Sequence, residues 1–373
     1  MRVGVAAGLV LWVFTAAAAA ATVPLEYESD ITSLTTACAL RASPTSVEED
    51  GVRSATLQLA GAEYPVWIDP GVGIPSLEID LDRDGTMESV EWERILPDGT
   101  WLAAPSVLLP AAESETALYR VLILWLPSLP VVVHYCRGDY RAGTFETSRR
   151  AVALALIDDN TDGAFDPKGD TLIVDVDGDG ELLSSADSHE RYALDEPFVV
   201  DGTTYAASAV ASDGAWIEID VAAESVAAKP PLLVGCPAPR FLAEDADGGS
   251  VDLGALRGRI VLLDFWAAWC APCLDELSTL VGIHEAFAEQ GVVVVGINLD
   301  RSRSAFDAAL ERNGLPYVHI YDGPDGPLSS LYRIAGLPMT YLIGRDGVIR
   351  GRALRGDALV AALAALLDEE DAS

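Results

Sequence analysis

The sequence is poor in basic residues and in cysteine. Its 373 residues include 24 Lys and Arg against 58 Asp and Glu, which gives a formal net charge of −34. Binding to nucleic acid or to acidic membrane surfaces needs clustered positive charge, so the composition excludes nucleic acid as a partner and disfavours such membranes. Five cysteines are too few for a disulfide-stapled scaffold, so the positions of these cysteines matter more than their number.

Hydrophobic residues are not scarce. They make up 50% of the chain, which is enough to bury real cores and excludes wholesale disorder despite the charge. The length predicts about two domains. The charge is unevenly shared, because residues 1–229 hold 38 acids and 13 bases whereas residues 230–373 hold 20 acids and 11 bases. Most of the acidity therefore belongs to the N-terminal part.

The N-terminus carries an export pattern. After Arg2 comes a small, apolar and uncharged run from Val3 to Ala21. This pattern predicts a secretory signal peptide over residues 1–21, with cleavage near Ala19–Ala21. About 20 apolar residues can also span a bilayer, so an uncleaved membrane anchor is the alternative. In either case we expect an exported protein, in the periplasm or another extracytoplasmic compartment where disulfides form.

Residues 22–228 lack any long helical periodicity. Short alternating segments are separated instead by clusters of Gly, Pro, Asp and Ser, a pattern typical of β-strands. Seven or more such strands predict a mainly-β domain of sandwich or barrel-like architecture. The expected strands are Ala55–Leu59, Tyr64–Ile68, Arg120–Trp125, Val131–Tyr135, Val152–Ile157, Thr171–Val174 and Trp216–Ile219.

Three loops of this domain contain carboxylates at alternate positions followed by glycine. Alternate residues of a tight turn point inward, and Ca²⁺ prefers six to eight oxygen ligands. The first loop matches the complete EF-hand loop pattern, and the other two match its first half. The candidate ligands are Asp80, Asp82, Asp84 and Glu91 in the first loop, Asp158, Asn160 and Asp162 in the second, and Asp175, Asp177 and Asp179 in the third.

The sequences that flank the first loop look extended rather than helical. They are Ser76–Ile79 and Glu88–Trp92, so we expect a strand–loop–strand calcium site and not an EF-hand. Bound Ca²⁺ would be structural, because it would neutralise carboxylates that otherwise repel one another. The alternative stays open that these loops are solvated turns, since Asp and Gly favour turns without any metal.

Beyond the linker Lys229–Pro231, residues 229–373 show alternating strand and helix signals. This alternation predicts a layered α/β domain with a central sheet. The expected strands are Ile260–Trp266, Val292–Leu299, Tyr317–Tyr321, Met339–Ile343 and Val348–Arg352, and the expected helices are Pro272–Gln290, Ser302–Asn313, Leu328–Ala335 and Asp357–Glu370.

A Cys-x-x-Cys pair lies where the first of these strands meets its helix. A thiol at a helix N-terminus is stabilised as the thiolate by the helix dipole and the free N–H groups. We therefore expect Cys270 to be the attacking thiolate and Cys273 the resolving thiol. Pro272 suits the first helical turn. A structural zinc site is disfavoured because no second Cys-x-x-Cys pair exists, and a purely structural disulfide would not explain the neighbouring aromatic residues, which include Trp269.

Four motifs resemble the TlpA/ResA-like thiol:disulfide oxidoreductase family, which has the thioredoxin fold. The resemblance covers Gly235–Leu367, about a third of the chain. It implies a cis peptide bond before Pro338, next to the active sulfurs, and an extended substrate that contacts the backbone of Leu337. The motifs are Gly235–Phe241, Leu256–Ile260, Cys270–Glu276 and Gly336–Thr340.

Several positions depart from the family pattern. Asp264 stands where the family often carries Asn, and a buried carboxyl there has a raised pKa and can take the proton from Cys273. Glu276 is either a second acid near the pair or an exposed first-turn helix residue. Ser278 and Met339 replace a family proline and threonine, which leaves the reduction potential and the substrate preference open. Peroxiredoxins are disfavoured because Ala267 replaces their threonine.

Three cysteines remain outside the pair. Cys38 and Cys136 both fall in the β-rich part and form the favoured bridge, which leaves Cys236 as a free thiol or as an alternative partner.

We therefore expect an enzyme that reduces disulfides of other exported proteins by dithiol exchange. It would use no catalytic cofactor and would depend on a separate thiol–disulfide partner for recycling. A disulfide oxidant or isomerase is the alternative within this chemistry. Another class of function, also open, is a calcium-dependent surface binding module with a thioredoxin-fold docking domain.

Overall fold

The computed structural model describes residues 21–371, with gaps at 25, 29–40, 45, 48–51, 60–61, 71–73, 93, 96–100, 105, 110–116, 126–131, 138–139, 161 and 168. The expected signal peptide lies, except for Ala21, outside the described residues, as does Cys38. The chain divides into two compact units. The N-terminal unit comprises residues 1–31, 41–180 and 192–228, and the C-terminal unit comprises residues 32–40, 181–191 and 229–373.

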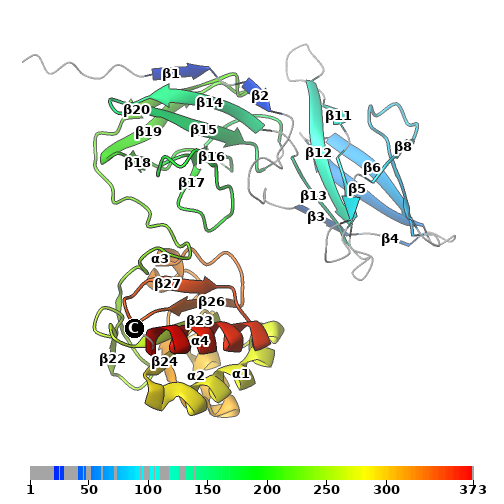
Figure 1. Ribbon diagram of the computed structural model, residues 1–373. Helices are drawn as coiled ribbons and strands as arrows, with labels where there is room; N and C mark the ends of the chain where they lie inside the picture. Colours follow the sequence, from blue (N-terminus) through cyan, green and yellow to red (C-terminus); the bar gives the residue numbers. More distant parts are fainter. Residues whose placement is uncertain are drawn as a thin grey trace, which may run out of the picture. The chain divides into compact units, whose positions relative to one another are not determined.

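The described part of the N-terminal unit is built from β-strands, which confirms the mainly-β prediction (Figure 1). One five-stranded sheet has the order β4-β5-β6-β7-β8, and a second sheet has the order β3-β13-β12-β10-β9, with β11 also paired to β12. The strands are β3 (Arg41–Pro44), β4 (Ser46–Val47), β5 (Arg53–Leu59), β6 (Ala62–Asp69), β7 (Ser76–Ile79), β8 (Glu88–Val90), β9 (Arg94–Ile95), β10 (Trp101–Ala103), β11 (Ser106–Leu109), β12 (Ala117–Trp125) and β13 (Val132–Arg137).

Two further sheets complete this unit. Their orders are β17-β16-β15-β14-β2 and β1-β20-β19-β18. Every strand expected from the sequence in this part of the chain is present. The strands are β1 (Ala21–Pro24), β2 (Glu26–Glu28), β14 (Tyr140–Glu146), β15 (Ala151–Ile157), β16 (Thr171–Val174), β17 (Arg191–Ala193), β18 (Phe198–Val200), β19 (Thr203–Val210) and β20 (Trp216–Val221).

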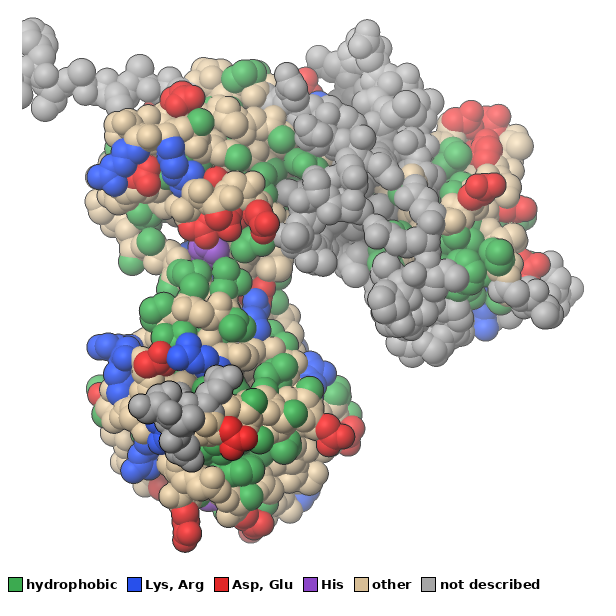
Figure 2. Space-filling view, viewed as in Figure 1, with side chains coloured by type: hydrophobic (Ala, Val, Ile, Leu, Met, Phe, Trp, Pro, Cys, Tyr) green, Lys and Arg blue, Asp and Glu red, His purple; other side chains and the backbone are tan. Residues whose placement is uncertain are grey.

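The sheets form because apolar and polar residues alternate along each strand. In β6, buried and exposed residues alternate at every position, so one face packs into the core and the other meets water. One core combines residues of β5–β7 with Val121, Ile123 and Trp125 of β12. A second core combines β14–β16 with β18–β20. Figure 2 shows that the acidic side chains of this unit gather in several separate patches.

The C-terminal unit contains one five-stranded mixed sheet of order β25-β24-β23-β26-β27. Helices α1, α2 and α4 pack on one face of the sheet, and α3 packs on the other with the hairpin β21–β22. The elements are β21 (Leu242–Glu244), β22 (Ser250–Asp252), β23 (Ile260–Trp266), α1 (Ala271–Phe287), a 3₁₀ turn (Ala288–Gln290), β24 (Val292–Asn298), α2 (Arg303–Asn313), β25 (Val318–Tyr321), α3 (Pro327–Leu331), β26 (Met339–Ile343), β27 (Ile349–Arg352) and α4 (Gly356–Asp371).

The structure differs from the sequence-based expectation at two places in this unit. Helix α3 ends at Leu331, earlier than expected, because Arg333 takes a left-handed conformation with φ 45°. The Arg333 guanidinium donates to the carbonyl oxygens of Asp187 at 2.8 Å and Pro230 at 2.7 Å, which holds the chain out of the helix. The hairpin of β21 and β22 is an additional element that the periodicity did not indicate.

Candidate active site

The two cysteines of the Cys-x-x-Cys pair lie at the start of α1, directly after the loop that follows β23. Cys270 is the N-cap residue of α1, and its sulfur accepts a hydrogen bond from the backbone N–H of Cys273 at 3.3 Å. The two residues form a disulfide with a Cα–Cα distance of 5.2 Å. Their position at the helix N-terminus stabilises a thiolate on Cys270 once the disulfide is reduced.

An exposed aromatic residue and a cis-proline loop flank the disulfide. Trp269 is 67% exposed although it is large and apolar, and it directly precedes Cys270. The peptide bond between Leu337 and Pro338 is cis, as the resemblance implied. Leu337 packs against the apolar cluster that contains both cysteines. The nearly buried sulfurs are thus bordered by a hydrophobic surface on which an extended peptide can lie.

Asp264 is a buried acid in the middle of β23. Its side chain is 2% exposed, and burial, followed by the negative charge of Glu276, raises the pKa of this carboxyl to about 7. Glu276 follows Cys273 by three residues and so lies near it on the same side of α1. The Glu276 charge therefore acts on Asp264 from the helix that carries the cysteines, and the raised pKa of Asp264 suits a group that accepts a proton near neutral pH.

Glu276 has a structural role that the sequence left open. Its Oε1 accepts a hydrogen bond from the backbone N–H of Gly356 at 2.7 Å, and Gly356 is the first residue of α4. A carboxylate at a helix N-terminus is stabilised by the helix dipole. Glu276 thus links the active-site helix to the last helix of the chain, and its charge also acts on Asp264.

Sequence reasoning missed the residue that holds the active-site loop. Both carboxylate oxygens of Asp300 accept the backbone N–H of Ala268, at 3.1 and 3.0 Å, and the side chain of Asn298 donates to Asp300 at 2.9 Å. Asp300 is 2% exposed. The sequence does contain a signal for this role. Parallel strands end at the same edge of a sheet, and Asn298 and Asp300 lie at the end of the apolar strand β24, which pairs with β23.

Replacing Asp300 with Ala should therefore loosen the loop between β23 and α1. The change removes hydrogen bonds to a buried carboxylate and leaves the Ala268 N–H without its acceptor, a loss of about 3 kcal/mol in the free energy of unfolding. Urea denaturation measures this loss. Asp300→Asn keeps one acceptor oxygen and should recover part of the stability. Equal stability of the Ala variant and the parent would contradict this role.

Sequence reasoning also missed Gly296, which lies in the strand next to Asp264. Gly296 pairs with Asp264 on one side and with His319 on the other. The imidazole of His319 lies over Gly296 and leaves no room for a Cβ atom. Burial lowers the pKa of His319 to about 4, so the ring is neutral at physiological pH and places no positive charge beside Asp264.

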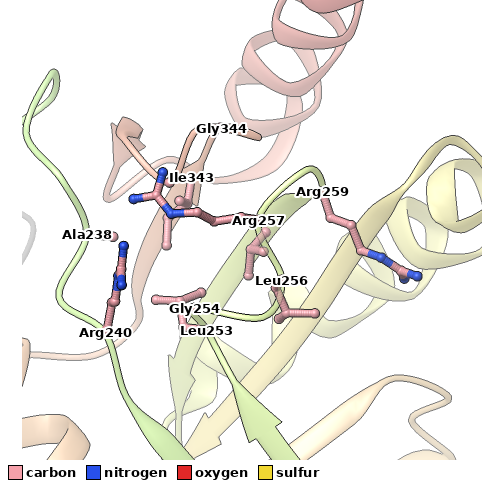
Figure 3. A pocket seen from close by; sticks show the side chains of 11 residues that line it. Ala238, Arg240, Leu253, Gly254, Leu256, Arg257, Arg259, Ile343 and Gly344 are labelled. Carbon is pink, nitrogen blue, oxygen red and sulfur yellow. The ribbon is translucent and has the colours of Figure 1, made fainter.

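A small pocket of about 20 Å³ lies elsewhere in the C-terminal unit (Figure 3). Its lining includes the three basic residues Arg240, Arg257 and Arg259, and contains no acid or cysteine. Arg259 directly precedes β23, whereas the cysteines follow the other end of that strand. The pocket is therefore separate from the redox site.

The three Asp-rich loops lie in the N-terminal unit, and each follows a strand. Carboxylate oxygens of Asp80, Asp82 and Asp84 lie within 4.8 Å of one another. The structure does not bring Glu91 into this group. Glu88 is also outside this group, although its Oε2 lies against the loop and accepts the backbone N–H of Leu81 at 2.8 Å.

In the second loop, Asp158 accepts the backbone N–H of Asp162 at 3.2 Å, and the side-chain oxygen of Asn160 accepts the same N–H at 2.8 Å. In the third loop, oxygens of Asp175, Asp177 and Asp179 lie within 4.8 Å of one another.

Three cysteines remain in addition to the redox pair. Cys236 is a free thiol of intermediate exposure. Cys136 belongs to β13, but its expected partner Cys38 is outside the described residues, so the pairing of these two stays a prediction. Within the part of the chain that the structure describes, no helix has the length and apolar character needed to span a membrane.

Comparison with known proteins identifies the family to which the C-terminal unit is related. Residues 234–352 match the AhpC/TSA family model. Thiol-disulfide oxidoreductase ResA of Bacillus subtilis (strain 168) is 32% identical over 123 residues, which cover 33% of this chain and 68% of that protein. ResA of Geobacillus kaustophilus (strain HTA426) is 31% identical over 122 residues, which cover 33% and 70%. A putative thiol:disulfide interchange protein DsbE from Chlorobium tepidum, of known structure, is 29% identical with a TM-score of 0.35 and covers 36% of this chain and 99% of that one.

The matched residues contain the main features of the redox site described above. They include the disulfide of Cys270 and Cys273, the buried Asp264 and the cis-proline loop at Pro338. The identity to two ResA proteins extends over about two thirds of their length. Through its C-terminal unit, the chain belongs to the ResA family of thiol-disulfide oxidoreductases.

Proposed function

We propose that this enzyme reduces disulfides of other exported proteins. The observation that carries the proposal is the Cys270–Cys273 disulfide at the N-terminus of α1, and the raised pKa of the buried Asp264 carboxyl supports it as the group that takes a proton from Cys273. The apolar, uncharged N-terminal run from Val3 to Ala21 supports export. The exposed Trp269 and the cis-proline loop support an extended protein segment as the substrate.

The reaction begins from the dithiol form. The Cys270 thiolate attacks one sulfur of the substrate disulfide, forms a mixed disulfide and releases the other substrate sulfur as a thiolate. Asp264 then accepts the proton of the Cys273 thiol. The Cys273 thiolate attacks the Cys270 sulfur, which forms the internal disulfide and releases the second substrate thiolate. The substrate gains two electrons, and the enzyme ends in the disulfide form that the structure contains.

Another cycle requires two electrons from outside the chain. We propose that the exchange needs no catalytic cofactor, because thiol–disulfide exchange moves electrons between sulfur atoms alone. We propose that a separate dithiol protein in the same compartment reduces the Cys270–Cys273 disulfide by the reverse sequence of exchanges. The direction of electron flow is then set by the reduction potential of the pair relative to that partner.

The midpoint potential of the Cys270/Cys273 couple tests the direction. The full-length protein would be equilibrated in buffers of defined thiol–disulfide ratio, and the dithiol fraction would be measured by mass spectrometry after alkylation. A reductant should have a potential below about −200 mV. A Cys236→Ser variant removes the free thiol from the measurement. A potential near about −120 mV, which is typical of strong oxidants, would contradict the proposal and favour disulfide formation.

A further inference from the structure

The first Asp-rich loop connects two paired strands and concentrates negative charge. It runs from Asp80 to Met87, between the antiparallel strands β7 and β8. Its three aspartates hold oxygens within 4.8 Å of one another. The hydrogen bond from the Leu81 N–H brings the carboxylate of Glu88 to the same loop. Three carboxylates so close together, with a fourth bonded to the backbone of the same loop, repel one another unless a cation lies between them.

One oxygen of this loop is buried without a hydrogen-bond partner. Asp80 is 7% exposed, and its Oδ2 accepts the backbone N–H of Gly85 at 3.1 Å. Its Oδ1 is buried and accepts no hydrogen bond. A buried carboxylate oxygen that has lost its water and gained no donor is costly. A metal ion supplies the missing partner.

The second loop repeats this arrangement between the paired strands β15 and β16. Three hydrogen bonds are equivalent in the two loops. Residues are counted from the first aspartate of each loop. The backbone N–H of residue 6 donates to the side chain of residue 1, that of residue 5 to the side chain of residue 3, and that of residue 7 to the side chain of residue 5. In the first loop these are Gly85 to Asp80, Asp84 to Asp82 and Thr86 to Asp84, and in the second they are Gly163 to Asp158, Asp162 to Asn160 and Ala164 to Asp162.

The second loop also contains a buried oxygen without a partner. Asp170, at the start of β16, is 2% exposed, and its Oδ1 accepts no hydrogen bond. Its other oxygen, Oδ2, accepts the backbone N–H of Asp166 at 2.8 Å, which holds the Asp170 carboxylate against the end of the second loop.

The third loop already has a cation of its own. The Arg150 side chain donates to Asp175 Oδ2 at 3.3 Å and to the Asp175 carbonyl oxygen at 2.8 Å. An arginine that pairs with the first acid of the loop satisfies the charge that a metal ion would otherwise neutralise. The inference is therefore limited to the first two loops.

We propose that Ca²⁺ binds in the first two Asp-rich loops, with Glu88 and Asp170 as ligands from the following strands. Only oxygen donors are present, which favours Ca²⁺ or Mg²⁺ over transition metals. The number of carboxylates and the irregular, partly exposed loops favour the larger ion, which accepts six to eight ligands in flexible geometry. Each ion would tie two neighbouring strands together, so its role is to stabilise the N-terminal unit.

The experiment compares two glutamates that lie three residues apart. Full-length protein, freed of metal with a chelator, would be titrated with CaCl₂ in a calorimeter. We expect binding at two sites. Glu88→Gln should weaken one site at least about tenfold because it removes a charged ligand. Glu91→Gln, which removes the same charge from a position outside the group, should leave both affinities unchanged.

Asp170→Asn tests the second loop in the same way and should weaken only the other site. Circular dichroism of each variant confirms that it is folded before the titration. If the parent protein binds no Ca²⁺ at millimolar concentration, the proposal is wrong. It is also wrong for the first loop if Glu91→Gln weakens binding as much as Glu88→Gln does. Displacement of Ca²⁺ by an equal concentration of Mg²⁺ would overturn the choice of ion.

Discussion

Replacing Cys270 with Ala should reduce the rate of disulfide reduction to below about one-thousandth of the parent rate. The thiolate of this residue is the nucleophile that opens the substrate disulfide, and no neighbouring group can take that place. Cys273 lies deeper, at 2% exposure, and cannot meet a large substrate. Reduction of insulin by dithiothreitol, followed by turbidity, measures the loss.

Two matched variants make this test specific. Cys273→Ser keeps the nucleophile but removes the resolving thiol, so a mixed disulfide with the substrate should accumulate and be visible by mass spectrometry. Cys236→Ser removes the free thiol of the same unit and should retain the parent rate. A Cys270→Ala variant that still exchanges thiols at the parent rate would contradict the assignment of the active site.

Replacing Asp264 with Asn should make the protein more stable and less active, and both effects should depend on pH. The pKa of this carboxyl is raised from about 4 in the unfolded chain to about 7 in the native state. The native state therefore binds the proton more tightly, and stability falls as pH rises from about 4 to about 7. The full difference corresponds to about 4 kcal/mol at pH values above 7.

Denaturation of the oxidised proteins at several pH values measures this effect. The stability advantage of Asp264→Asn should grow by about 1.4 kcal/mol for each pH unit between pH 4 and pH 7 and then level off. Glu276→Gln keeps an oxygen for the Gly356 N–H but removes the charge that contributes to the raised pKa, so the transition should move to lower pH. A stability difference that is constant with pH would show that Asp264 does not titrate in this range.

The same variant should slow the release of substrate from the mixed disulfide. Asn cannot accept the proton of Cys273, and loss of a general base costs about 100-fold or more in rate. The rate of mixed-disulfide resolution in the parent should rise with pH around 7, whereas the rate in Asp264→Asn should lack this rise. Stopped-flow measurement after mixing with a model disulfide separates this step from the first attack.

The sequence predicted that the cysteine pair lies where a buried strand meets a helix, and the structure shows this arrangement, because its determinants are local. A buried apolar strand, two cysteines at fixed spacing and a proline in the first helical turn all fall between Ile260 and Cys273. The strands of the N-terminal unit were likewise predictable, since alternation of apolar and polar residues reports directly on which face is buried. The cis bond before Pro338 followed from the family resemblance and is present.

The features that sequence reasoning missed depend on contacts between distant segments. Asp300 contacts a backbone N–H 32 residues earlier, and Glu276 contacts one 80 residues later. Spacing rules also misplaced one loop residue. These rules place the last acid of an EF-hand loop at position 12, which is Glu91 here. In the structure β8 spans Glu88–Val90, and Glu91 follows it, outside the group of Asp80, Asp82 and Asp84. The periodicity of apolar residues gives no information about contacts between distant segments.

The link between Glu276 and Gly356 also has a consequence for the order in which the protein is made. Synthesis proceeds from the N-terminus, so the two active-site cysteines leave the ribosome well before Pro338 and Gly356. Until those later segments have been synthesised, the cysteines lack the loop of Pro338 beside them, and α1 lacks its contact with α4. The helix that carries the thiol pair can therefore complete its packing only after α4 has also been synthesised.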